Sequence, residues 1–347
     1  MHATPHDGYG ESHHRTRASG SPQRSGGVAS VGAMAGVEWE RAWQEALYGP
    51  GGFYRDDTGP AGHFTTATHG ATGAVLAAAL VALARGHGLA RVVDVGAGRG
   101  ELLAHLHAAA PDLHLTGVDV VDRPAWLPHA CDWVRSPGGA ELPATLTGLA
   151  DALVVAHEWL DVVPCAVAAV DDRGVLRHVE VDPATGTETL GRDVDGDELA
   201  WARVHWPTTA PGDRVEVGLG RDRAWADLLA RLDRGLAVAV DYGHTACARP
   251  AGGTLTAYRE GRSVTPVPDG TCDLTAHVAM DTLDHDELVD QRTALRRLGV
   301  DGSTPPHDLA LRDPGAYLQA LGRSSAAAAL LAPGGFGDFL WAFKRVG

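Results

Sequence analysis

The segment Val92-Val93-Asp94-Val95-Gly96-Ala97-Gly98-Arg99-Gly100-Glu101 decides the expected fold of this 347-residue chain. It predicts a buried strand with an acidic residue near its end, a glycine-rich turn, and a helix from Arg99 to about Ala109. Glycine has no Cβ, so the backbone of this turn can approach a bound ligand closely. The amides at the start of the following helix favour a carboxylate or another anionic group.

The spacing of the glycines indicates the kind of ligand. It is G-x-G-x-G here, whereas dinucleotide-binding Rossmann proteins use G-x-G-x-x-G. This difference favours S-adenosylmethionine over NAD. The same pattern also occurs in tight strand-to-helix turns that bind nothing, so the turn alone does not decide the function.

A second carboxylate supports a nucleoside cofactor. The apolar run Leu113–Val118 ends in Asp119, which follows Gly100 by 19 residues. In a doubly wound sheet the two strands end side by side, and a carboxylate there can accept both ribose hydroxyls. The alternative is that Asp119 only caps its own turn. Together, the two features predict a cofactor site.

Composition excludes several classes of function. The formal net charge of −15 disfavours non-specific nucleic-acid binding, because phosphates would be repelled, and it suits a basic protein partner. No apolar run approaches the ~20 residues that span a bilayer. Residues 1–36 are rich in His, Gly, Ser and Arg and lack the apolar core of a signal peptide, so we expect a disordered tail, with one folded domain over residues 37–347.

Cysteine and histidine usage favours a cytoplasmic protein without a metal site. The four cysteines are scattered and form no C-x-x-C pair, which is typical of reduced thiols. His157-Glu158-Trp159-Leu160-Asp161 superficially resembles a zincin motif, but the second histidine is missing. We therefore expect no catalytic metal.

The remaining apolar runs alternate between strand and helix patterns, which predicts an α/β fold with a doubly wound, mostly parallel sheet. Further strands are expected at Trp133–Val134, Ala152–Ala156, Ala166–Val170, Val175–Val181, Leu236–Asp241 and, as an edge strand, Phe339–Val346. Helices are expected at Glu38–Leu47, Thr72–Ala84, Ala224–Leu232, Asp286–Leu298 and Pro314–Leu331, and Asp195–His205 is expected in a smaller insertion.

Polar residues follow two of these strands. His157, Glu158 and Asp161 come after Asp151–Val155, and Asp241-Tyr242 ends another strand. Ligands of open α/β sheets lie at the carboxyl ends of the strands, so these groups would face a methyl acceptor. Carboxylates there can orient a cationic acceptor and take its proton. The alternative is that Glu158 caps a helix and Asp161 pairs with a surface arginine.

Several blocks in order carry a resemblance to a known family. The chain resembles the MidA-type (DUF185) S-adenosylmethionine-dependent methyltransferases, relatives of the mitochondrial arginine methyltransferase that assists complex I assembly. Besides the glycine-rich turn, the blocks are Tyr48-Gly49-Pro50-Gly51-Gly52-Phe53-Tyr54, Gly62-His63-Phe64-Thr65-Thr66-Ala67, Glu158-Trp159-Leu160-Asp161-Val162-Val163-Pro164, Asp241-Tyr242-Gly243, Gly253-Thr254-Leu255-Thr256-Ala257-Tyr258 and Cys272-Asp273-Leu274-Thr275-Ala276-His277-Val278.

The resemblance implies a class I methyltransferase (Rossmann-like) fold with an additional helical region, S-adenosyl-L-methionine as cofactor, and a protein substrate methylated on arginine. It implies that Glu158 and Asp161 face the acceptor. The cofactor would be held by Asp94, Gly96, Ala97, Gly98, Gly100 and Asp119, with Thr65 and Thr66 on a loop folded over it.

The chain departs from the family pattern at three places. The family has Asp at the position of His63, Pro-Glu at Thr68-His69 and Asn at His157. All three positions lie in the loop or at the acceptor side, so the acceptor is less certain than the cofactor. A non-catalytic assembly factor with the same fold is one alternative, and an NAD(P)-linked oxidoreductase is another.

Overall fold

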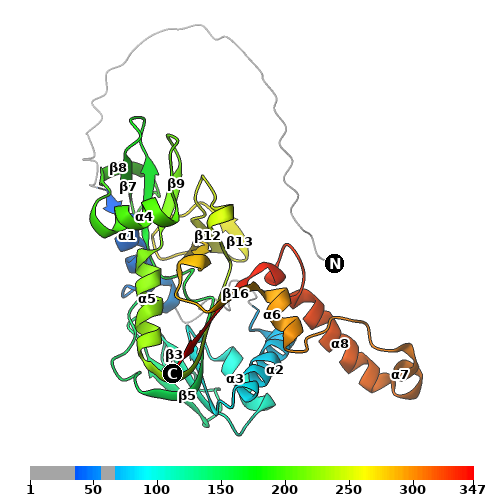
Figure 1. Cartoon of the computed structure of the whole chain (residues 1–347). Coiled ribbons are helices and arrows are strands. Elements are labelled where there is room, and N and C mark those ends of the chain that lie inside the picture. Colours follow the sequence, from blue (N-terminus) through cyan, green and yellow to red (C-terminus); the bar gives the residue numbers. More distant parts are fainter. Residues whose placement is uncertain (1–35, 56–66) are drawn as a thin grey trace, which may run out of the picture. The chain divides into compact units, whose positions relative to one another are not determined.

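The main element is a seven-stranded mixed sheet of order β16-β17-β10-β5-β2-β3-β4 (Figure 1). The computed structural model describes residues 36–55 and 67–347, all within the compact unit of residues 35–347. The strands are β2 (Arg91–Val95), β3 (His114–Asp119), β4 (Cys131–Arg135), β5 (Leu149–His157), β10 (Leu232–Asp241), β16 (Glu287–Asp290) and β17 (Leu340–Val346).

Six of these strands run in the same direction, and β17 runs in the opposite one. β10, β5, β2, β3 and β4 pair in parallel, so their carboxyl ends meet at one edge. β17 pairs antiparallel with β10, and β16 pairs antiparallel with β17. The α/β class is therefore confirmed, and the sheet is mixed.

Helices cover both faces of the sheet. α2 (Gly70–Gly86), α3 (Glu101–Ala109), α6 (Gln291–Arg297) and α8 (Pro314–Leu330) gather on one side, and α5 (Leu219–Ala230) lies on the other (Figure 1). Successive side chains of a strand point to opposite faces. Accordingly, Val92 packs in the core beneath α2 and α3, whereas Val93 and Val95 pack in the core that contains Trp225 of α5. The valine run of β2 is thus buried from both sides.

A second sheet is antiparallel. Its path is β1-β7-β6-β9, with β8 paired to β7. The elements are β1 (Val37–Glu38), β6 (Ala166–Val170), β7 (Leu176–Val181), β8 (Glu188–Asp193) and β9 (Arg214–Val217), with the helices α1 (Trp39–Tyr48) and α4 (Gly196–His205) packed near it.

Two predictions about this region need correction. β6 and β7 lie at the expected residues but belong to the antiparallel sheet, because an all-apolar run does not encode the direction of its partner. The additional region is also not only helical. The expected insertion at Asp195–His205 forms α4, which packs on this sheet.

Two C-terminal predictions were also partly wrong. The segment predicted as the helix Asp286–Leu298 starts as β16, and α6 begins only at Gln291, where the Asp290 side chain accepts a hydrogen bond from the Thr293 amide. β17 matches the strand predicted at Phe339–Val346, but it is not an edge strand, because β16 covers its outer side.

The other predicted elements are present with shifted ends. α3 begins at Glu101 instead of Arg99, and α8 ends at Leu330. Smaller elements complete the fold: α7 (His307–Arg312), β11 (Gly243–His244), β12 (Thr256–Arg259), β13 (Arg262–Val264), β14 (Asp273–Thr275), β15 (Val278–Ala279) and the 3-10 turn η4 (Met280–Thr282). Among the described residues, no helix combines the length and apolarity needed to cross a membrane.

Candidate functional site

A cavity of about 860 Å³ lies at the carboxyl ends of the parallel strands. The glycine-rich turn after β2 and the end of β3 line one part of it, and the segments that follow β5 and β10 line another. This position is the usual ligand site of open α/β sheets. The carboxyl ends of four strands therefore converge on a single hollow.

The glycine-rich turn is held against β3. The amides of Gly96 and Ala97 both donate to the Val118 carbonyl, at 2.9 and 3.2 Å. Gly98 has a φ of +58°, a left-handed conformation that favours glycine. Among the described residues, a Cβ built on Gly98 would meet only the Glu101 side chain within 4 Å. The backbone at Gly98 therefore leaves room on its cavity side for a bound group.

The two carboxylates of this part lie next to each other. The Asp119 Oδ2 accepts a hydrogen bond of 2.8 Å from the Gly98 amide, and its Oδ1 accepts one of 3.3 Å from Val121. Asp119 thus both faces the cavity and caps its own turn. Burial raises its pKa to about 6, although the backbone hydrogen bonds oppose this. Burial, together with the nearby Asp119 and Glu101, raises the pKa of the buried Asp94 to about 8.

The start of α3 differs from the expectation. The Arg99 amide donates to the Glu101 carboxylate at 3.0 Å, so this helix end holds a protein carboxylate. Gly100 is the N-cap of α3, with φ +82°, and does not line the cavity. A Cβ there would come within 2.8 Å of Leu127, so Gly100 is required by packing.

His157 and Glu158 occupy the end of β5. His157 is buried, and burial lowers its pKa to about 4, so it is neutral near pH 7. Its Nδ1 lies 3.4 Å from the Glu158 Oε1. Burial raises the pKa of Glu158 to about 8, and the negative charges of Asp161 and Asp273 add to this effect. Glu158 also has a φ of +52°, a strained conformation that is frequent at functional sites.

Asp161 is fixed by hydroxyl groups. Its Oδ2 accepts hydrogen bonds from Tyr242 and from Thr275, the latter at 2.8 Å. Within the described part of the chain, its buried Oδ1 has no hydrogen-bond partner. Asp161 lines the cavity, and this oxygen is buried in the cavity wall. Within residues 36–55 and 67–347, neither structural alternative holds: β6 is the element that follows Glu158, and the Asp161 side chain pairs with Tyr242 and Thr275 and with no surface arginine.

Asp241 supports the turn that carries Asp161. It is fully buried, and its Oδ2 accepts hydrogen bonds from the amides of Leu160 and Asp161, at 3.0 and 3.3 Å. Burial and the charges of Asp161 and Glu158 raise its pKa well above the ordinary value. Asp241 does not line the cavity, whereas the neighbouring Tyr242 does.

Several groups in the cavity wall lie outside the predicted site residues. Tyr54 donates a hydrogen bond of 2.6 Å to Asp273, and burial raises the pKa of Asp273 to about 8. Tyr48 donates to the Val162 carbonyl at 3.1 Å. These tyrosines and Asp273 lie in blocks that carry the family resemblance, which was the only signal for them. Phe339 contacts Tyr242 and His157 from the far end of the chain.

Some predicted residues cannot be placed. Thr65, Thr66 and His63 lie outside the described residues. His69 is described, lines the cavity, and has its Nε2 3.7 Å from the Glu101 carboxylate. No group of three or more His, Cys, Asp or Glu side chains in residues 36–55 and 67–347 could hold a metal ion.

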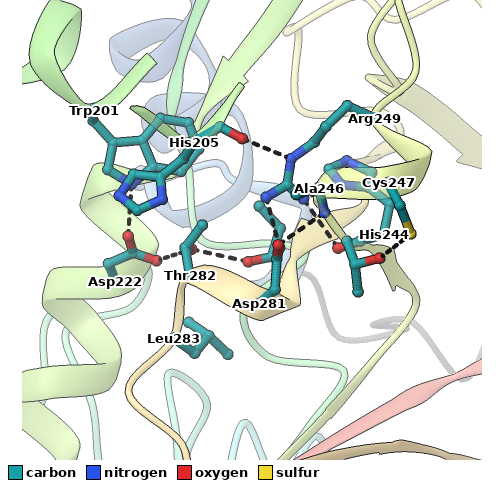
Figure 2. Close-up of polar contacts among 12 residues, drawn as sticks. Trp201, His205, Asp222, His244, Ala246, Cys247, Arg249, Asp281, Thr282 and Leu283 are labelled. Atoms are coloured by element: carbon teal, nitrogen blue, oxygen red, sulfur yellow. Dashed lines mark hydrogen bonds and ion pairs between the residues drawn. The ribbon is translucent and has the colours of Figure 1, made fainter. Parts of the chain in front are cut away.

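A second polar cluster lies outside the cavity wall and has a structural role. Figure 2 shows Asp222 of α5 between Trp201 and Thr282, and Arg249 beside His205, His244 and Asp281. Asp222 accepts hydrogen bonds of 2.6 Å from both of its neighbours. Arg249 donates to Asp281 at 2.6 Å. None of these residues lines the cavity. The cluster joins α4, α5 and η4.

Comparisons with known proteins agree with this geometry. A family model described as "Putative S-adenosyl-L-methionine-dependent methyltransferase" (Methyltransf_28) matches residues 126–299, which is half of the chain. This range contains the segments after β5 and β10, and the glycine-rich turn precedes it. No curated protein matches the chain.

Two solved structures from Burkholderia thailandensis are similar. One is a COG1565 superfamily member and likely methyl transferase bound to S-adenosyl-homocysteine, with 23% identity and a TM-score of 0.68, covering 89% of this chain and 87% of that one. The other is a native structure of a COG1565 superfamily protein, with 23% identity and a TM-score of 0.69, covering 90% and 87%. At this identity the likeness concerns the fold.

Proposed function

The chain belongs to this family of S-adenosyl-L-methionine-dependent methyltransferases, and from that premise we propose that it transfers the methyl group to a side chain of a protein. The observation that carries the proposal is the junction of two groups of residues in one cavity: an open glycine-rich turn with Asp94 and Asp119, and an acidic wall with Glu158 and Asp161. We define the first as the cofactor half and the second as the acceptor half.

The residues of the cofactor half suit S-adenosyl-L-methionine. The open backbone face at Gly98 admits a ligand. Asp119, at the end of the neighbouring strand, is in position to accept hydroxyl hydrogen bonds from a nucleoside. Asp119, whose pKa is about 6, adds negative charge beside a cationic ligand at neutral pH. When bound, this cofactor supplies an electrophilic methyl group on a positively charged sulfur.

The acceptor half suits a cationic side chain. Glu158 and Asp161 each have a buried oxygen without a hydrogen-bond partner in the described residues, and both residues line the cavity. A guanidinium group has donors for both oxygens. Its positive charge would stabilise the ionised form of Glu158, which then accepts the proton that the acceptor nitrogen loses. The family resemblance adds arginine as the acceptor.

Methyl transfer is tested with radiolabelled S-adenosyl-L-methionine and a panel of arginine-, lysine- and histidine-containing peptides. We expect label in the arginine peptides and its loss in Glu158→Gln. Label in histidine or lysine peptides alone would exclude arginine and keep the methyltransferase.

A non-catalytic assembly factor is the second candidate. The observation in its favour is that Glu158, with a pKa of about 8, holds a proton at neutral pH in the free protein, and that His157 beside it is neutral. In that case the protein binds S-adenosyl-L-methionine and labels no peptide between pH 7 and 9.

A further inference from the structure

Arg221 of α5 is a buried arginine that donates hydrogen bonds to four backbone carbonyls around the acceptor half. Its side chain is 2% exposed. Nη2 donates to the Asp161 carbonyl at 2.7 Å and Nε to the Val163 carbonyl at 3.0 Å. Nη1 donates to the carbonyls of Ala276 and His277, at 3.1 and 3.0 Å. One guanidinium thus joins the turn after β5 to the segment before β15.

The charge of Arg221 is unusual for its depth. Among the described residues its hydrogen bonds go to uncharged carbonyls and it forms no ion pair within 4.0 Å. The Trp43 ring centre lies 5.6 Å from its guanidinium carbon. Burying a charge without a charged partner is costly, so other groups must compensate for it. Carbonyl dipoles supply one part, and the acidic acceptor half supplies the other.

The turn after β5 is held from both sides. Asp241 accepts hydrogen bonds from its amides at Leu160 and Asp161, and Arg221 donates to its carbonyls at Asp161 and Val163. Other contacts also hold the turn: the Val163 amide donates to the Leu160 carbonyl at 3.3 Å, the Ala276 amide to the Asp161 carbonyl at 3.2 Å, and Tyr48 to the Val162 carbonyl. Arg221 and Asp241, from the consecutive elements α5 and β10, add two buried side chains that bind its carbonyls and its amides.

The sign of the charge also matters. Arg221 lowers the pKa of Asp241 and of Tyr48, against burial and the neighbouring carboxylates, which raise them. The charged and titratable groups around this turn lie in or next to α1, the 3-10 turn after it, β5, β10, β14 and β15. They are Tyr48, Tyr54, His157, Glu158, Asp161, Asp241, Tyr242, Asp273 and His277.

We propose that Arg221 is the positioning residue of the acceptor half: it fixes the turn that carries Asp161 and places a positive charge at the turn that Asp241 also holds. The kinetic part of this inference rests on the proposed methyl transfer, whereas the electrostatic part does not. Arg221 itself touches neither the cavity nor the acceptor.

Arg231 provides a matched control. It lies just after α5, donates to the backbone carbonyls of Pro143 and Leu146 at 2.7 and 2.8 Å, and lines no part of the cavity. If both arginines had only a structural role, Arg221→Gln and Arg231→Gln would have the same effect, namely a lower stability and no other change.

The experiment measures the pKa of Asp241 by NMR, in protein labelled with ¹³C at the aspartate carboxyl carbons. The Asp241→Asn variant identifies the Asp241 signal. The experiment requires no methyl acceptor. We expect Arg221→Gln to move the Asp241 titration to higher pH. Arg221→Lys keeps the positive charge and loses the planar guanidinium group, so its Asp241 titration should lie close to that of the wild type. Arg231→Gln should leave it in place.

The acceptor KM of Arg221→Lys separates the effect of positioning the turn from the effect of the positive charge. We expect Arg221→Lys to raise the acceptor KM about tenfold, equivalent to about 1.4 kcal/mol, with the affinity for S-adenosyl-L-methionine unchanged. An unmoved Asp241 titration in Arg221→Gln, or a shift of the same size in Arg221→Lys, would overturn the proposal. If no peptide is methylated by the wild type, the proposed function fails, and the titration still decides the role of Arg221.

Discussion

The cofactor half and the acceptor half of the cavity are built in different ways. Gly98, Asp94 and Asp119 lie within one strand-turn-helix-strand unit, and their contacts join neighbouring residues of the sheet. The acceptor half gathers Tyr54, Glu158 and Asp273 from segments far apart in the chain. The first is therefore determined by local sequence, and the second by tertiary packing. This difference predicts that the two halves can be disrupted separately.

The largest effect is expected from Gly98→Val, which acts on the cofactor half alone. A side chain there occupies the open backbone face and strains a φ of +58°. We expect calorimetry to show an affinity for S-adenosylhomocysteine at least about 100-fold lower, a loss near 3 kcal/mol.

Gly148→Val is the control for this variant. Gly148 has a similar φ of +66°, and a Cβ there would meet only Asp233 at 3.9 Å, next to β5. It should lose similar stability and keep its affinity. Equal loss of affinity in both variants would mean that backbone strain, and not ligand contact, explains the result.

Glu158→Gln should break the acceptor half alone. Removing a general base lowers the rate about 100-fold or more. The affinity for S-adenosyl-L-methionine should stay within about twofold of wild type, since the loss of one acceptor-side carboxylate leaves the glycine-rich turn intact. Asp338→Asn, a half-exposed carboxylate that pairs with Arg292 and lines the same cavity, is the control and should have little effect.

A smaller effect is expected from Tyr242→Phe. Asp161 then loses one of its two hydroxyl donors and keeps Thr275. A hydrogen bond contributes about 1 kcal/mol, so the acceptor KM should rise about fivefold. A change in cofactor affinity of the same size would show that the two halves are coupled through this residue.

The smallest effect concerns pH, and here the two halves should behave alike. Burial raises the pKa of Asp94 from 3.8 to about 8, so the folded protein keeps a proton that the unfolded chain releases within this range. The stability contributed by this group is complete below pH 3.8 and is lost as the pH rises through 8. Glu158 has the same sign. In thermal unfolding, the Tm of the wild type should fall from pH 5 to pH 9, and the Tm of Asp94→Asn should fall less steeply. An equally steep fall in both proteins would contradict the raised pKa of Asp94.

The sequence was informative where contacts are local. The turn, both cofactor carboxylates and the parallel strands around them follow from one segment and its neighbour. The antiparallel direction of β6 and β7 could not be predicted, because an apolar run such as Ala166–Val170 fits either direction. Arg221 could not be found either. Its partners are backbone carbonyls, which leave no complementary residue in the sequence.

The measurement that tests the central claim most directly is a calorimetric titration of the wild-type protein with S-adenosyl-L-methionine, with S-adenosylhomocysteine and NAD in parallel. The account predicts that both adenosyl ligands bind at one site per chain and that NAD does not bind. Binding of NAD, or no heat with either adenosyl ligand, would contradict it.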